Sequence, residues 1–79
     1  MKIPKEAVVF VTDEHPMFVG VKMPKRSKFN GCTALIRREF CHFSSDSVTI
    51  DRVPVDVYAP GDMMNRECIT YEEFCDAWR

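Results

Sequence analysis

The chain has 79 residues, of which 46% are hydrophobic and 29% are charged, and its formal net charge is −1. A chain of this length buries about 60% of its unfolded surface, which leaves no room for a dinucleotide-binding α/β domain, a large barrel or a repeat array. Six Phe, two Tyr and one Trp supply a core and exclude a disordered chain. We therefore expect residues 1–79 to form a single compact domain.

The apolar runs and the cysteines indicate the cellular compartment of the protein. The first apolar run, residues 7–11, is shorter than the roughly 7–15 residues of a secretory signal. No window approaches the roughly 18 apolar residues of a membrane span. Four cysteines are too few for a disulfide scaffold. We expect a cytoplasmic protein that begins at Met1, binds no membrane and keeps its cysteines as thiols.

The first predicted element is an antiparallel hairpin. Residues 7–11 (AVVFV) are β-branched and aromatic, which is typical of a strand. In residues 17–23 every second residue is apolar, which predicts a second strand with one face in the core. The polar segment 12–16 ends in a proline and suits the turn between them. The predicted core residues of the second strand are Met17, Val19, Val21 and Met23.

The segment from Thr33 to Phe43 is ambiguous. Pro24 ends the preceding strand, residues 25–28 form a basic loop, and Asn30-Gly31 is a turn signal. As a strand, residues 33–43 have no clean apolar face. As a helix, they place Ile36, Phe40 and Phe43 on one side, so the pattern favours a helix. A strand stays open as the alternative, because an Asn-Gly turn also suits a hairpin.

Residues 48–57 predict strand structure with a break in the middle. Val48 and Ile50 share one phase, whereas Val53, Val55 and Val57 share the other. The phase changes at residues 51–52, which predicts a bulge or a tight turn there. Because proline donates no ladder hydrogen bond, residue 54 predicts an open strand edge. Residues 59–62 (APGD) predict a type II turn.

The C-terminal segment predicts a helix. Thr70 and Glu73 have the spacing of a capping box, and Ile69 and Phe74 that of a hydrophobic staple. An apolar stripe follows at helical spacing: Tyr71, Phe74, Cys75 and Trp78. The predicted fold class is therefore α+β: a small antiparallel sheet of three or four strands covered by a C-terminal helix, with a second helix at 33–43 as the favoured reading of that segment.

No motif predicts catalysis or a bound cofactor. Cysteines 32, 41, 68 and 75 lack the close pairs of a zinc site. Cys41 and His42 are neighbours, and neighbouring side chains point apart on a helix or strand. There is no glycine-rich phosphate loop and no nucleophile elbow. We expect no catalytic residues, no metal and no cofactor, and a protein that is not an enzyme.

Charge is distributed unevenly along the chain. Residues 21–38 hold six bases and no acid, and residues 39–76 hold nine acids and two bases. Either the two stretches pack together and neutralise each other, or one of them contacts a partner. The candidate basic partner-binding segment is Lys22, Lys25, Arg26, Lys28, Arg37 and Arg38. The candidate acidic partner-binding face is Asp46, Asp51, Asp56, Asp62, Glu72, Glu73 and Asp76.

These features resemble those of small phage-encoded anti-CRISPR inhibitor proteins. The resemblance rests on one motif-free domain, the acidic run from Asp46 to Asp76 and the terminal helix of residues 70–79 (TYEEFCDAWR). It implies a phage or mobile-element protein in the host cytoplasm. Such a protein binds a CRISPR-Cas type nucleic-acid-handling complex and blocks it stoichiometrically. Anti-CRISPR proteins share no common fold, so the resemblance assigns no site residue.

We therefore predict a binding module whose partner is a protein or a ribonucleoprotein. The alternative is a small nucleic-acid-binding or regulatory protein that uses the basic segment 22–38, although the sequence pI of about 6.1 disfavours nucleic acid. A self-associating module is the third reading, because an open strand edge or a cysteine at a symmetric contact would permit it. The expected oligomeric state is monomer or homodimer.

Overall fold

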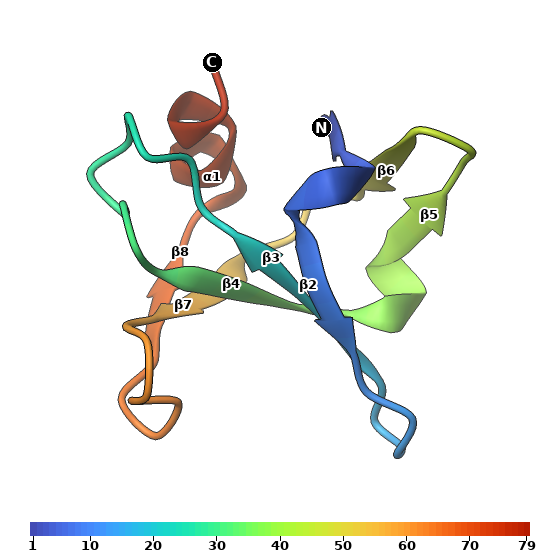
Figure 1. Ribbon diagram of the computed structural model, residues 1–79, viewed down its shortest axis with the longest axis horizontal. Helices are drawn as coiled ribbons and strands as arrows, with labels where there is room; N and C mark the ends of the chain where they lie inside the picture. Colours follow the sequence, from blue (N-terminus) through green and yellow to red (C-terminus); the bar gives the residue numbers. More distant parts are fainter.

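The computed structural model describes residues 1–79 and contains two antiparallel β-sheets and one short α-helix (Figure 1). The smaller sheet has the order β1-β6-β5 and the larger has the order β2-β3-β4-β7-β8. The protein is mostly β, so α+β describes it only loosely. The elements are β1 Lys2–Pro4, β2 Val8–Val11, β3 Phe18–Lys22, β4 Thr33–Arg37, β5 Cys41–Phe43, β6 Ser47–Ile50, β7 Val55–Tyr58, β8 Glu67–Ile69 and α1 Tyr71–Ala77.

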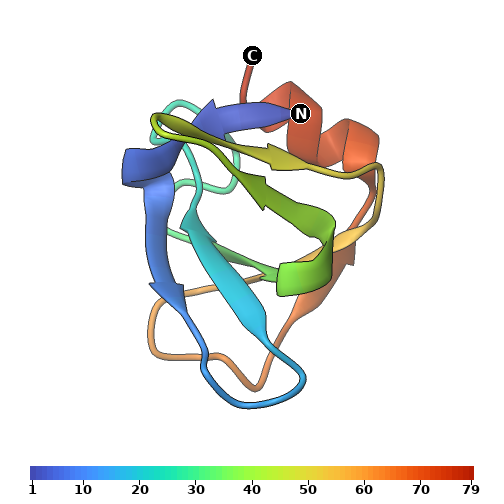
Figure 2. The same ribbon diagram turned by 90° about the vertical axis from the view of Figure 1, so that its right-hand side faces the viewer.

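The chain passes between the two sheets at three places. A 3-10 turn, Lys5–Ala7, separates β1 from β2, and a second, Arg38–Phe40, separates β4 from β5. The third passage is residues 51–54, between β6 and β7. Figure 2 shows the strands of the smaller sheet in front of the larger one. The phase change predicted at residues 51–52 is therefore the step from one sheet into the other.

The predicted helix at 33–43 is wrong, because these residues form β4, a 3-10 turn and β5. Both faces of β4 are buried, so its sequence does not alternate between apolar and polar residues. Ala34 and Ile36 pair with Val21 and Val19 in the core, while Leu35 is buried on the opposite face. The turn signal before it was the better guide, since Gly31 has φ +86°.

The hairpin, the turn at 59–62 and the capped helix are confirmed. β2 and β3 pair antiparallel, and Val19, Val21 and Met23 are buried, although Met17 is exposed. The Asp62 amide donates to the Ala59 carbonyl at 3.0 Å, and Gly61 has φ +79°. The open edge predicted at Pro54 is wrong: β7 pairs with both β4 and β8, and Pro54 precedes it.

The core lies between the two sheets and is closed by α1. Its members come from both sheets and the helix, and they include Ile3, Val19, Val21, Ile36, Val48, Ile50, Val55, Val57, Ile69 and Phe74. Ile69 and Phe74 are both buried, as expected for a staple. The four cysteines are free thiols. The only α-helix is too short to cross a membrane.

Phe74 should matter more to stability than the larger Trp78. Phe74 is fully buried, whereas Trp78 is half-buried and its ring lies tilted to that of Phe74. Phe74→Ala should lower the free energy of unfolding by about 3–5 kcal/mol because it leaves a cavity, and Trp78→Ala should lower it by less. Urea unfolding followed by circular dichroism measures both. An equal loss in the two variants would contradict this account of the core.

Candidate functional site

The face of the larger sheet that is turned away from the core, called here the outer face, is the candidate site. The strand register places one residue from each of its five strands in a single row across it. That row is Phe10, Gly20, Leu35, Asp56 and Cys68. The pair Phe18–Arg37 lies on one side of this row, and the shorter row Lys22–Thr33–Tyr58 lies on the other side, on the same face.

The outer face carries an apolar cluster of its own. Leu35 and Tyr58 are each only 7% exposed, yet neither belongs to the core cluster between the sheets. Phe10 lies directly over Gly20, and a Cβ at Gly20 would overlap its ring. The glycine therefore provides the space in which the phenylalanine rests on the sheet. Leu35 and Tyr58 are thus buried on this face without contributing to the core between the sheets.

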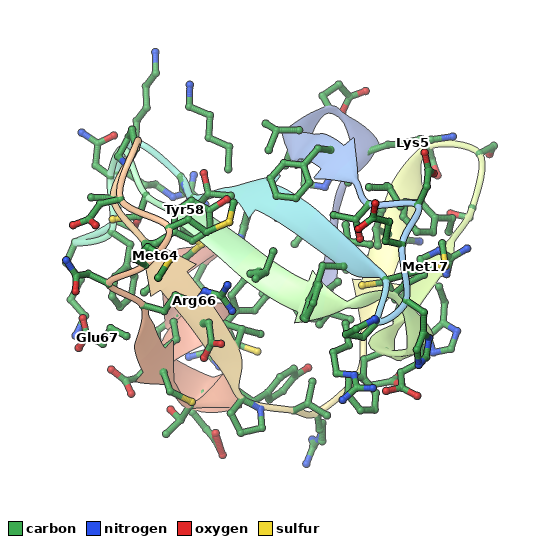
Figure 3. All side chains as sticks on the ribbon, turned by 90° about the horizontal axis from the view of Figure 1, so that it is seen from below. Lys5, Met17, Tyr58, Met64, Arg66 and Glu67 are labelled. Atoms are coloured by element: carbon green, nitrogen blue, oxygen red, sulfur yellow. The ribbon has the colours of Figure 1, made fainter.

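Two loops flank the outer face and carry exposed methionines. The connections β2–β3 (12–17) and β7–β8 (59–66) extend from the sheet in the same direction, at the lower right and lower left of Figure 1. Figure 3 views this side, with Met17 at one end and Met64 beside Tyr58 at the other. Met17 is 39% exposed, Met63 is 44% exposed and Met64 is 92% exposed. Large apolar side chains exposed to this extent are typical of contact surfaces.

Charges on the outer face nearly cancel. Lys22 and Arg37 face outward, but so does Asp56. The Arg37 Nε also lies 2.8 Å from a carboxylate oxygen of Glu39. The outer face is therefore an apolar surface with a mixed polar rim, without an excess of either sign.

The structure divides the predicted basic segment among several places. Lys22 and Arg37 lie on the outer face, whereas Lys25, Arg26 and Lys28 lie in the β3–β4 loop. Arg38 is in the 3-10 turn, where its Nη1 donates to the Cys41 carbonyl at 3.0 Å and its guanidinium lies 4.6 Å from the centre of the Phe43 ring. The six bases therefore do not form one continuous patch.

The predicted acidic residues are also distributed over several elements. Asp46 lies between β5 and β6, and Asp51 lies 3.0 Å from the His42 Nε2. Asp56 is on the outer face, and Asp62 accepts hydrogen bonds from the Asn65 amide. Only Glu72, Glu73 and Asp76 share one element, the helix α1. A single acidic face made of all seven residues is not evident from their positions.

The β3–β4 loop and α1 partly neutralise each other. The Lys28 ammonium lies 3.7 Å from a Glu73 carboxylate oxygen, and the Arg26 Nη2 donates to the Trp78 carbonyl at 3.1 Å. Arg26, Lys28, Glu73 and Asp76 line a shared hollow of about 290 Å³. Of the two explanations for the uneven charge, packing of the two stretches against each other accounts for this part of it.

The thiols and imidazoles are dispersed over the molecule. Burial is the main cause that raises the pKa of the Cys41 thiol to about 11, with Arg38 opposing it, so this thiol stays protonated at neutral pH. His15 lines one hollow of about 240 Å³ and Cys32 lines another of about 440 Å³. No group of three or more His, Cys, Asp or Glu residues is placed to hold a metal ion.

Comparison with family models, with curated proteins and with solved structures finds no match to this chain. The sequence did not identify Phe10, Tyr58 or the methionine loops as candidates. The pair Met63-Met64 in a polar turn region was the one signal available for them.

The contact between Phe10 and Gly20 is testable by a double-mutant cycle. Gly20→Ala should lower the free energy of unfolding by about 1–3 kcal/mol because the new methyl group displaces the ring. In the background of Phe10→Ala the same substitution should cost much less. Urea unfolding of the four proteins measures the coupling. Additive effects would show that the ring does not rest on residue 20.

The capping box at the start of α1 makes the stability of the protein depend on pH. Hydrogen bonds from the Thr70 amide and hydroxyl, with a further contribution from Lys28, hold the pKa of Glu73 below its ordinary value. A depressed pKa adds stability above the unfolded-state pKa, and this stability is lost as the pH falls through the lower folded-state value.

Glu73→Gln should therefore lower the melting temperature at about pH 7, and the difference from the wild type should shrink below about pH 4. Thermal melts of both proteins across this range check it. The matched control is Glu72→Gln, which lacks the cap contacts. A difference that stays constant with pH would contradict this role for the Glu73 carboxylate.

Proposed function

We propose that this protein acts by binding a protein partner through the outer face of the five-stranded sheet and its two methionine loops. The observation that carries the proposal is the pair of exposed methionines, Met17 and Met64, on the two loops that flank the outer face. Aromatic residues, methionine and arginine are enriched in protein–protein interfaces. Methionine is also flexible and polarisable, so it adapts to the surface of a partner.

The charge of the outer face favours a protein over a nucleic acid. Binding to a phosphate backbone needs an excess of cations that displace counterions. Lys22 and Arg37 are offset by Asp56 and Glu39. The remaining bases of the candidate segment lie in the β3–β4 loop, where Lys28 is paired with Glu73, and in the 3-10 turn. Nucleic-acid binding through residues 22–38 is therefore the second choice.

The most specific form of the proposal is inhibition by contact. The protein would occupy a surface of a nucleic-acid-handling complex of the CRISPR-Cas type and block it with one-to-one stoichiometry. Such inhibition needs complementary shape and no reactive group.

The test compares two surfaces of the same protein. Wild-type protein and matched variants are used to capture partners from a cell lysate, and the affinity for the recovered complex is then measured. Met17→Ser with Met64→Ser should weaken binding at least about tenfold, because the variant removes two exposed apolar side chains that a partner would bury. The control pair, Lys25→Gln with Glu72→Gln, should bind like the wild type.

Two results would contradict the proposal. One is a wild-type protein that retains no protein at all, or retains only free DNA or RNA. The other is a partner whose affinity falls in the Lys25 and Glu72 control but not in the methionine variant, which would place the contact on the charged side of the molecule.

A further inference from the structure

A second surface of the molecule is the open edge of β2. This strand lies at the end of the five-stranded sheet, with β3 on one side and no strand on the other. Figure 2 shows it at the left margin of the molecule. Residues 7–11 contain no charged residue, and the side chains of Val9 and Val11 are 52% and 41% exposed. The edge is therefore apolar and accessible.

The backbone of β2 has hydrogen-bonding groups available for another strand. The Thr12 amide donates to the Phe18 carbonyl at 2.9 Å, so the backbone groups of Thr12 point towards β3. Alternate residues of an antiparallel strand direct these groups to opposite sides, so those of Val11 point to the open edge. Unpaired backbone groups at the edge of a sheet are a template for strand addition.

The other sheet edges carry features that oppose strand addition. β1, β5 and β8 have three residues each, whereas β2 has four. β1 contains Lys2 and Pro4, β5 contains His42, and β8 contains Glu67. Charged residues, proline and short length are the usual means by which proteins protect an edge. On β2 the only such feature is the register shift between Val8 and Phe10.

We propose that β2 pairs antiparallel with β2 of a second copy of this chain and forms a symmetric dimer. The charges that flank the strand favour a second copy of the chain as the partner and antiparallel pairing with it. Lys5 and Glu6 precede the strand, and Asp13 and Glu14 follow it. Antiparallel pairing brings Lys5 of one copy towards the acidic end of the other strand, whereas parallel pairing would bring the two acidic ends together.

The dimer would join two five-stranded sheets into one continuous sheet, and the two outer faces would then lie on one assembly. A strand of four residues makes a small interface, and small interfaces are weak and transient. Dimerisation should therefore depend on concentration in the micromolar range. It does not rest on the proposed function, because self-association is measured on the protein alone, without any partner.

The experiment is sedimentation velocity of the full chain over a range of concentrations, in the presence of a reductant. Wild-type protein should shift from monomer to dimer. Val11→Lys should raise the dissociation constant at least about tenfold, because it places a charge on the apolar edge. Val11→Thr keeps a β-branched side chain and should dimerise, as should the edge control Cys68→Lys on β8.

A charge exchange tests the orientation of the pair. Lys5→Glu should weaken the dimer, and combining Lys5→Glu with Asp13→Lys should restore it. Circular dichroism shows that each variant is folded. The proposal is overturned by a wild-type protein that stays monomeric at every concentration, by a dimer that survives Val11→Lys unchanged, or by equal losses in Val11→Lys and Cys68→Lys.

Discussion

The limited supply of apolar residues in a chain of 79 residues governs this structure. The smaller sheet and α1 both pack on the inner side of the larger sheet, where Phe74 and the valines of β3 and β7 meet. On the other side, Leu35 and Tyr58 are buried outside that core. The large apolar side chains exposed around that side are the methionines of the two flanking loops.

The electrostatics are consistent with a function that depends on contact. The basic β3–β4 loop and the acidic helix lie together, so part of the charge asymmetry in the sequence is neutralised between these two elements. The thiol with the raised pKa, Cys41, is buried, and the other cysteines and the histidines are dispersed. The outer face of the larger sheet, by contrast, carries charges of both signs around its apolar residues.

The sequence was a good guide wherever a local rule acts alone. The hairpin of β2 and β3, the turn at Gly61 and the cap at Thr70 each follow from neighbouring residues. It was misleading where contacts between distant parts of the chain determine the structure. Both faces of β4 are buried, with Ala34 and Ile36 in the core and Leu35 on the outer face, so the strand shows no alternation of apolar and polar residues. β1 and β8 have three residues each, too few to show a period. The sequence could not predict the candidate site for the same reason, because its residues come together only through the pairing of distant strands.

Hydrogen exchange of the protein alone and bound to its captured partner tests the central claim most directly. The account predicts protection of backbone amides in residues 12–18 and 58–66 on binding, with α1 and the loop 24–28 unchanged. Protection confined to α1 and the loop 24–28 would contradict it, because the partner would then contact the charged side and leave the outer face of the sheet free.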